Sequence, residues 1–135
     1  MTSPDPTSTT RAAVASFLAA VHARDPDAAA SCFAEGARYA NVPHPPVIGP
    51  AGVRALLAPI LSRSSDVRWD LVTSAYDGSR AFLERVDRFR IDGREYAIEC
   101  TAVVEVDPAT GLVTSFRDYV DLGVWRARLD GVLDR

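Results

Sequence analysis

Four segments in the second half of the sequence alternate between apolar and polar residues, which is the period of β-strands rather than of helices. They cover residues 67–76, 80–90, 94–107 and 112–121. The connections between them are rich in Asp, Gly and Pro, which are typical turn residues. We therefore expect three hairpin connections in series and an antiparallel sheet.

The first half of the sequence has a helical period instead. Val14, Phe17, Leu18 and Val21 recur at the spacing of one helix face within a predicted helix at residues 10–24. Further helices are predicted at 27–33, 50–64 and 122–133, with an extended segment at 37–42 and a proline-rich loop from 43 to 49. Helices that precede an antiparallel sheet indicate an α+β fold in which the helices pack on one side of the sheet.

Length and composition narrow the possible classes of protein. The 135 residues suffice for one domain, predicted at 10–135 after a disordered tail at 1–9. A net charge of −3 without a basic stripe argues against a nucleic-acid partner. No apolar run approaches the roughly 20 residues that cross a bilayer, so we expect no membrane partner. The start has no secretory pattern and the two cysteines are far apart, so we expect free thiols and a cytoplasmic protein.

The predicted strand at 80–90 carries two charges on an otherwise apolar face. Arg85 and Asp87 alternate with Ala81, Leu83 and Phe89. If this face points outward, Leu83 and Phe89 are exposed together with the charges. If it points inward, an uncompensated ion costs several kcal/mol, so both charges need partners. We favour the inward orientation.

Three further polar side chains repeat this pattern on other strands. Asp118 lies between Phe116 and Val120 on one strand face, and Tyr39 and Asn41 share a face at i, i+2. Taken singly, Tyr39 fits a half-buried aromatic residue and Asn41 a residue that fastens a turn. Taken together, these residues can meet Arg85 and Asp87 in one pocket.

Other chemistries find little support in the sequence. All 15 cationic side chains are Arg, which excludes a Schiff base on an enzyme lysine. His22 and His44 have no nearby cysteine or acidic cluster, so we expect no metal site. His44 lies between prolines and fits the rim of a pocket or the surface better than a catalytic position.

Three motifs together resemble the limonene-1,2-epoxide hydrolase (LEH) family. They are the segments Tyr39-Ala40-Asn41-Val42-Pro43-His44-Pro45-Pro46, Glu84-Arg85-Val86-Asp87 and Arg117-Asp118-Tyr119-Val120-Asp121-Leu122. The resemblance implies a cone-shaped α+β fold, shared with nuclear transport factors, ketosteroid isomerases and SnoaL-like polyketide cyclases. A curved antiparallel sheet would be packed by the N-terminal helices around a deep pocket. It also implies epoxide opening without a cofactor or metal, and a homodimer.

The resemblance also implies a role for each polar residue. Asp118 would deprotonate a water held by Tyr39 and Asn41, Asp87 would protonate the epoxide oxygen, and Arg85 would lie between the two carboxylates. Epoxide opening by water needs this pairing, because neither neutral water nor an alkoxide leaving group reacts well unaided. Arg suits the bridging position because its planar guanidinium can donate to two carboxylates and stays charged.

We therefore expect an enzyme that converts a small or medium-sized apolar epoxide to a vicinal diol in one step. Candidate pocket residues are Leu57, Trp69, Leu71, Leu83, Phe89, Ile98 and Phe116. One alternative is an intramolecular epoxide-opening cyclase, or another cyclase or isomerase, in the same fold. The other is a non-catalytic protein that binds an apolar ligand. The homodimer is expected to form through the outer sheet face that bears Val86, Val103 and Tyr119.

Overall fold

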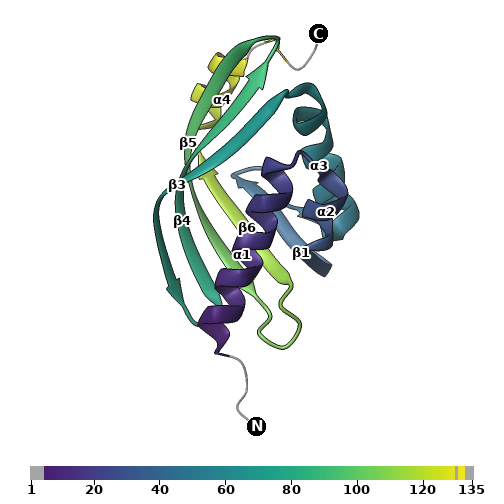
Figure 1. The fold of residues 1–135 in the computed structure, drawn as a ribbon, viewed down its shortest axis with the longest axis vertical. Coiled ribbons are helices and arrows are strands. Elements are labelled where there is room, and N and C mark those ends of the chain that lie inside the picture. The colour runs from purple at the N-terminus through teal and green to yellow at the C-terminus, as the bar shows by residue number, and fades with distance from the viewer. Residues whose placement is uncertain (1–4, 130, 133–135) are drawn as a thin grey trace.

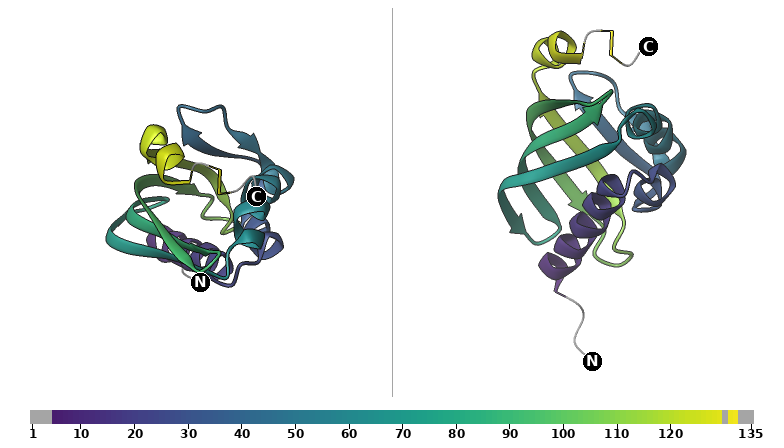
Figure 2. Two further views of the ribbon diagram at one scale, coloured as in Figure 1. Left: turned by 90° about the horizontal axis from the view of Figure 1, so that it is seen from above. Right: turned by 45° about the horizontal axis from the view of Figure 1, so that its top comes forward.

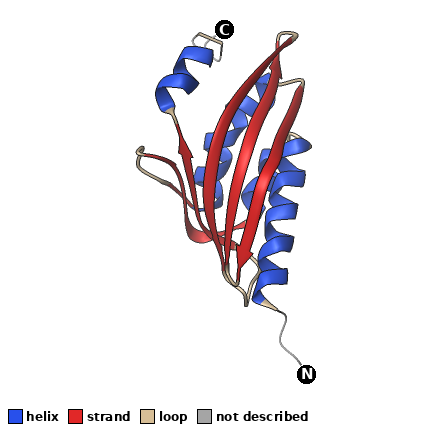
Figure 3. Ribbon diagram, turned by 90° about the vertical axis from the view of Figure 1, so that its left-hand side faces the viewer, coloured by secondary structure: helices blue, strands red, loops and turns tan. Residues whose placement is uncertain are grey.

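Six strands form one curved, open sheet, and helices pack against it (Figures 1 and 3). The computed structural model describes residues 5–129 and 131–132. The helices are α1 (Pro6–His22), α2 (Pro26–Ser31), α3 (Gly49–Arg63) and α4 (Leu122–Leu129). The strands are β1 (Phe33–Val42), β2 (Val47–Ile48), β3 (Asp66–Asp77), β4 (Arg80–Ile91), β5 (Arg94–Val106) and β6 (Val113–Val120). The predicted α+β class is confirmed.

The strand order β2-β1-β6-β5-β4-β3 contains the predicted antiparallel series of β3 to β6. The sheet is not antiparallel throughout, because β1 joins β6 in parallel. This pairing places Tyr39 opposite Phe116 and Asn41 opposite Asp118. Polar side chains from the first and last long strands are thereby brought together at the middle of the sheet.

Helix α1 begins earlier than the sequence predicted. Asp5 accepts a hydrogen bond from the Thr7 backbone N–H at 3.1 Å and Pro6 occupies the first turn, where its missing N–H is harmless. Residues 6–9 are thus helical, and their assignment to a disordered tail was wrong; residues 1–4 lie outside the described residues. Thr10 then fixes α1 to the β3–β4 turn, donating to the Gly78 carbonyl at 2.8 Å.

The last helix is shorter than predicted. Asp121 caps it, as it accepts hydrogen bonds from the backbone N–H groups of Gly123 and Val124 at 3.0 and 3.1 Å. Helix α4 ends at Leu129, and residues 130 and 133 of the predicted helix lie outside the described residues. It lies over one end of the sheet (Figure 2). None of the helices in the described ranges is both long and apolar enough to span a membrane.

An aromatic cluster fills the core between α1 and the sheet. Phe17 of α1 packs against Phe33, Tyr39, Trp69 and Phe116, with ring centroids 5.2–6.3 Å apart. The Tyr39 and Phe116 rings are stacked at 4.7 Å with an interplanar angle of 4°. Because the Tyr39 ring contacts Phe17, Phe33 and Phe116, its hydroxyl is held in a fixed position next to β6.

Candidate active site

Arg85 joins two carboxylates at the centre of the inner sheet face. Its Nε and Nη2 donate to Oδ1 and Oδ2 of Asp87 at 3.0 and 2.9 Å. Its Nη2 also donates to Asp118 Oδ2 at 3.1 Å, and its Nη1 lies 3.0 Å from Asp118 Oδ1. Relative exposures of 1% for Arg85, 5% for Asp87 and 4% for Asp118 exclude the alternative of an outward-facing pair.

The three groups carry one positive and up to two negative charges in a buried setting. Burial disfavours the charged form of Arg85 and lowers its pKa. The negative charges of Asp118 and Asp87 together have the larger effect, so the pKa of Arg85 rises well above its ordinary value. The guanidinium also lies over the Trp69 ring, 4.7 Å from its centroid. Burial raises the pKa of Asp87 even though Arg85 opposes the shift. Asp87 is therefore suited to retain a proton beside a permanent cation.

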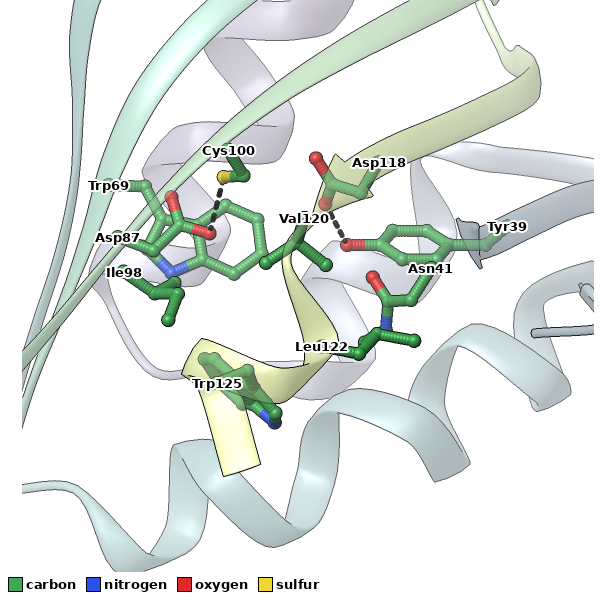
Figure 4. A pocket seen from close by; sticks show the side chains of 10 residues that line it. All are labelled: Tyr39, Asn41, Trp69, Asp87, Ile98, Cys100, Asp118, Val120, Leu122 and Trp125. Carbon is green, nitrogen blue, oxygen red and sulfur yellow. Dashed lines mark hydrogen bonds between the residues drawn. The ribbon is translucent and has the colours of Figure 1, made fainter. Parts of the chain in front are cut away.

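Tyr39 and Asn41 approach Asp118 from β1. The Tyr39 hydroxyl points at Asp118 Oδ2 over 3.5 Å, a long hydrogen bond (Figure 4). Burial and then the charge of Asp118 raise the pKa of Tyr39 well above its usual range, so the hydroxyl remains a donor. Asn41 is half-buried, adjoins Asp118 in the parallel ladder and lines the same pocket. A hydroxyl, an amide and a carboxylate thus converge where a water can be held.

The pocket in front of these groups encloses about 70 Å³. That is ample for one ordered water, which needs only about 10–15 Å³ on this measure, and leaves room for a small organic group. Across the pocket from Asn41 and Asp118 lie Trp69, Ile98 and Asp87 (Figure 4). The lining residues are Tyr39, Asn41, Trp69, Asp87, Ile98, Cys100, Asp118, Val120, Leu122 and Trp125.

Only Trp69 and Ile98 of the seven pocket candidates line this cavity. Leu57, Leu83, Phe89 and Phe116 are instead buried in the core. Leu57 belongs to α3, Phe116 packs against Phe17 of α1, and Phe89 packs against Trp125 of α4. Leu71 is 40% exposed, since β3 is an edge strand and its pairing with β4 shifts between Leu71 and Thr73. Assigning these five residues to the pocket was wrong.

The sequence analysis missed four lining residues. Val120 follows Asp118 by two positions and Cys100 follows Ile98 by two, so strand alternation alone would have placed both on the inner face. Leu122 and Trp125 reach the pocket through the docking of α4, which no period in the sequence reveals. Trp125 packs edge-on against Phe89, with centroids 6.0 Å apart.

Cys100 belongs to the charged cluster as well as to the pocket wall. Its Sγ accepts from Arg85 Nη2 at 3.1 Å and lies 3.4 Å from Asp87 Oδ2, to which the thiol donates. Burial, followed by the charge of Asp87, raises the pKa of this thiol. It therefore remains neutral and does not add a negative charge beside the carboxylates. Both cysteines are free thiols, as predicted.

The histidines lie away from this cluster. His44 is exposed, and its Nε2 is 3.5 Å from Arg126 Nη2 on α4. His22 Nε2 accepts from the Trp69 backbone N–H at 3.0 Å and so ties α1 to β3. Within residues 5–129 and 131–132, His, Cys, Asp and Glu side chains form no group of three or more that can hold a metal ion.

Comparisons with known proteins place the chain in a family. The SnoaL-like domain matches residues 14–116, and the chain belongs to this family. The structure is similar to an LEH-like epoxide hydrolase from M. tuberculosis, with 26% identity and a TM-score of 0.76 over 94% of this chain and 89% of that one. This similarity agrees with the resemblance carried by the three motifs.

Two further similarities concern the fold alone. A protein from Xanthomonas campestris that is proposed to be a polyketide cyclase is 23% identical, with a TM-score of 0.76 over 93% of this chain and 99% of that one. A proposed SnoaL-like polyketide cyclase from Shewanella denitrificans is 14% identical, with a TM-score of 0.78 over 90% and 97%. One cone-shaped fold therefore carries different chemistries, and the side chains of the pocket must decide between them.

Proposed function

We propose that the protein is an epoxide hydrolase that adds water to a small or medium-sized apolar epoxide and releases a vicinal diol. The observation that carries this proposal is the pair of buried carboxylates bridged by Arg85, with both carboxylates facing one pocket. The similarity to an LEH-like epoxide hydrolase supports it. The apolar pocket wall formed by Ile98, Val120, Leu122 and Trp125 suits a hydrocarbon substrate.

The reaction needs one proton transfer at each end of the pocket. Asp118 removes a proton from a water that also contacts Tyr39 and Asn41, and the water oxygen attacks an epoxide carbon. The carbon–oxygen bond breaks, and Asp87 delivers its proton to the departing oxygen. One proton has then moved to Asp118 and one has left Asp87, so solvent exchange restores both groups.

Arg85 balances the single negative charge that the two carboxylates hold between them. With Asp87 protonated and Asp118 ionised, the cluster is neutral overall, which lowers the cost of burying it. As Asp87 loses its proton, the bidentate contact with Arg85 compensates the new negative charge. A Lys can supply the charge at one point but not two parallel hydrogen bonds.

Two other functions remain compatible with the fold. A cyclase that opens an epoxide with the substrate's own hydroxyl needs no enzyme-held water, whereas Tyr39 and Asn41 beside Asp118 favour a bound water. A protein that only binds an apolar ligand gains nothing from three buried ionisable groups, whose desolvation costs several kcal/mol per ion. Hydrolysis gives a role to both carboxylates, Arg85, Tyr39 and Asn41.

The test is a panel of terpene, cyclohexene and styrene oxides incubated with the purified protein. We expect diols from at least one of them, detected by chiral gas chromatography, and diol formation at least about 100-fold slower from Asp118→Asn under the same conditions. An equal rate of diol formation in both proteins would point to a contaminating hydrolase or to a reaction that does not use Asp118. A cyclic ether from a hydroxyl-bearing epoxide, with no diol from any substrate, would favour the cyclase.

A further inference from the structure

The indole N–H of Trp69 is a buried donor that the cluster described above does not use. Trp69 is 4% exposed, and no atom within the described parts of the chain accepts a hydrogen bond from its Nε1. Buried side-chain donors are nearly always paired, because an unpaired one forfeits its interaction with water. An unpaired donor in a pocket wall therefore indicates a partner on a ligand.

The position of the indole identifies which ligand atom it can reach. Trp69 pairs with Asp87 in the β3–β4 ladder, and Asp87 pairs with Ile98 in the next one. All three residues line the pocket, where Figure 4 shows the indole beside both neighbours. A ligand oxygen that accepts the proton of Asp87 consequently lies next to the indole N–H.

Packing alone explains the ring of Trp69 but not its nitrogen. One face covers the Arg85 guanidinium at 4.7 Å, and the ring also contacts Phe17 and Phe89 at centroid distances of 5.9 and 6.3 Å. A phenyl ring at this position can cover the guanidinium as well, without burying an unpaired donor. Packing therefore does not explain why this position carries an indole nitrogen.

We propose that the Trp69 indole N–H donates a hydrogen bond to the epoxide oxygen and acts with Asp87 as a second electrophilic group. This inference rests on the proposed hydrolase function. The indole keeps its proton throughout: as the carbon–oxygen bond breaks, the electron pair goes to the oxygen, Asp87 protonates it, and the N–H only hydrogen-bonds to it. The hydrogen bond strengthens as negative charge develops, so it contributes more to the transition state than to substrate binding.

This role predicts a loss in kcat rather than a rise in KM. For Trp69→Phe, which retains an aromatic face over Arg85, we expect kcat to fall about tenfold and KM to change less than about threefold.

A sharper comparison replaces the indole N–H of Trp69 by sulfur without changing the shape of the ring. β-(3-Benzothienyl)alanine can be incorporated at position 69 in a Trp125→Phe background, and the Trp125→Phe protein with ordinary Trp69 is its matched reference. The isosteric protein should show the same fall in kcat with an unchanged melting temperature.

Nuclear magnetic resonance observes the hydrogen bond directly. The chain has two tryptophans, so ¹⁵N-labelled protein gives two indole signals, and Trp69→Phe assigns them. Titration with cyclohexane-1,2-diol, the product of cyclohexene oxide hydrolysis, should shift the Trp69 N–H proton downfield and slow its exchange with solvent.

The outcomes separate this inference from the proposed function. If the unmodified protein makes no diol from any epoxide, the hydrolase function fails and this inference fails with it. If the protein hydrolyses epoxides, but the isosteric variant retains full kcat or the Trp69 signal stays unmoved while the diol inhibits, only the role of Trp69 is overturned. A tenfold lower kcat together with the downfield shift supports the role.

Discussion

Each face of β4 carries an arginine that pairs with an aspartate at 2.9 Å, but the two pairs lie in opposite surroundings. Arg85 and Asp87 on the inner face are 2.9 Å apart, and their side chains are 0% and 7% exposed. Arg88, on the outer face, lies 2.9 Å from Asp70, but these side chains are 33% and 45% exposed. Distance therefore does not distinguish the pairs, whereas burial does.

Burial outweighs the effect of the arginine on the pKa of the inner carboxylate. On the outer face, the hydrogen bond from Arg117 lowers the pKa of Glu105. On the inner face, burial raises the pKa of Asp87 although Arg85 donates two hydrogen bonds to it. The outer carboxylate Glu105 is thus held in its ionised form, whereas burial makes the inner carboxylate Asp87 easier to protonate than an exposed aspartate. This difference is what makes the inner pair suitable for catalysis.

The largest effect should follow from removing either inner carboxylate. We expect Asp118→Asn and Asp87→Asn each to lower kcat about 10²- to 10⁴-fold, because each removes a proton transfer. Circular dichroism should show a folded protein in both cases, since the amide is nearly isosteric. Retention of more than a tenth of the rate by either variant would mean that the acid and base are misassigned.

Arg85→Lys should have the next largest effect. The ammonium group keeps the charge but cannot donate in parallel to Asp87 while contacting Asp118, so both carboxylates lose their orientation. Misplaced catalytic groups cost about 10²-fold, which is the fall in kcat that we expect. Steady-state kinetics on a substrate found in the epoxide panel measures it. Near-normal kcat would show that the guanidinium geometry is irrelevant.

A substitution on the outer sheet face should affect dimer formation and not catalysis. Val72, Phe82 and Tyr119 are 62%, 42% and 49% exposed there, which fits the expected homodimer through this face. We expect a dimer at micromolar concentration by light scattering, and a monomer for Tyr119→Arg, which places a charge in the apolar patch. A wild-type monomer, or an unaffected dimer in the variant, would remove this face as the interface.

The smallest effect is expected for the outer pair itself. Asp70→Ala removes this ion pair with Arg88, which has the same length as the inner one, yet exposed pairs contribute only about 0.2–1 kcal/mol. Chemical denaturation should show a loss within that range, and kcat should stay within twofold. A larger loss of stability would show that burial is not the variable that separates the two faces.

Strand alternation explains how much of the site the sequence revealed. The side chains of Arg85, Asp87 and Asp118 follow their strand period inward, so a single sequence sufficed to predict that they gather on the inner face, where Asp87 and Asp118 line the pocket. Tyr39 and Asn41 follow the same rule, although their proximity to Asp118 depends on the parallel β1–β6 pairing, which alternation does not encode.

The remaining errors have tertiary causes. Strand alternation places Leu71 on the same face as Trp69. It lies, however, on an edge strand next to an irregular pairing, so its side chain is left exposed. Phe116 also points to the inner face, yet it stacks on Tyr39 in the core and does not line the pocket. Trp125 closes the pocket only because α4 docks over the sheet end. Periodicity assigns a face, and only three-dimensional packing decides what covers it.

The most direct test of one-step water activation uses heavy-oxygen water with enzyme in excess over epoxide. If Asp118 deprotonates a water, the first diol formed should carry one heavy oxygen from solvent. If Asp118 instead attacks the epoxide and forms an ester, cleavage of that ester places a light carboxylate oxygen in the first diol. Mass spectrometry of the product from a single turnover distinguishes the two. A first-turnover diol without the heavy isotope would contradict the assignment of Asp118 as a base.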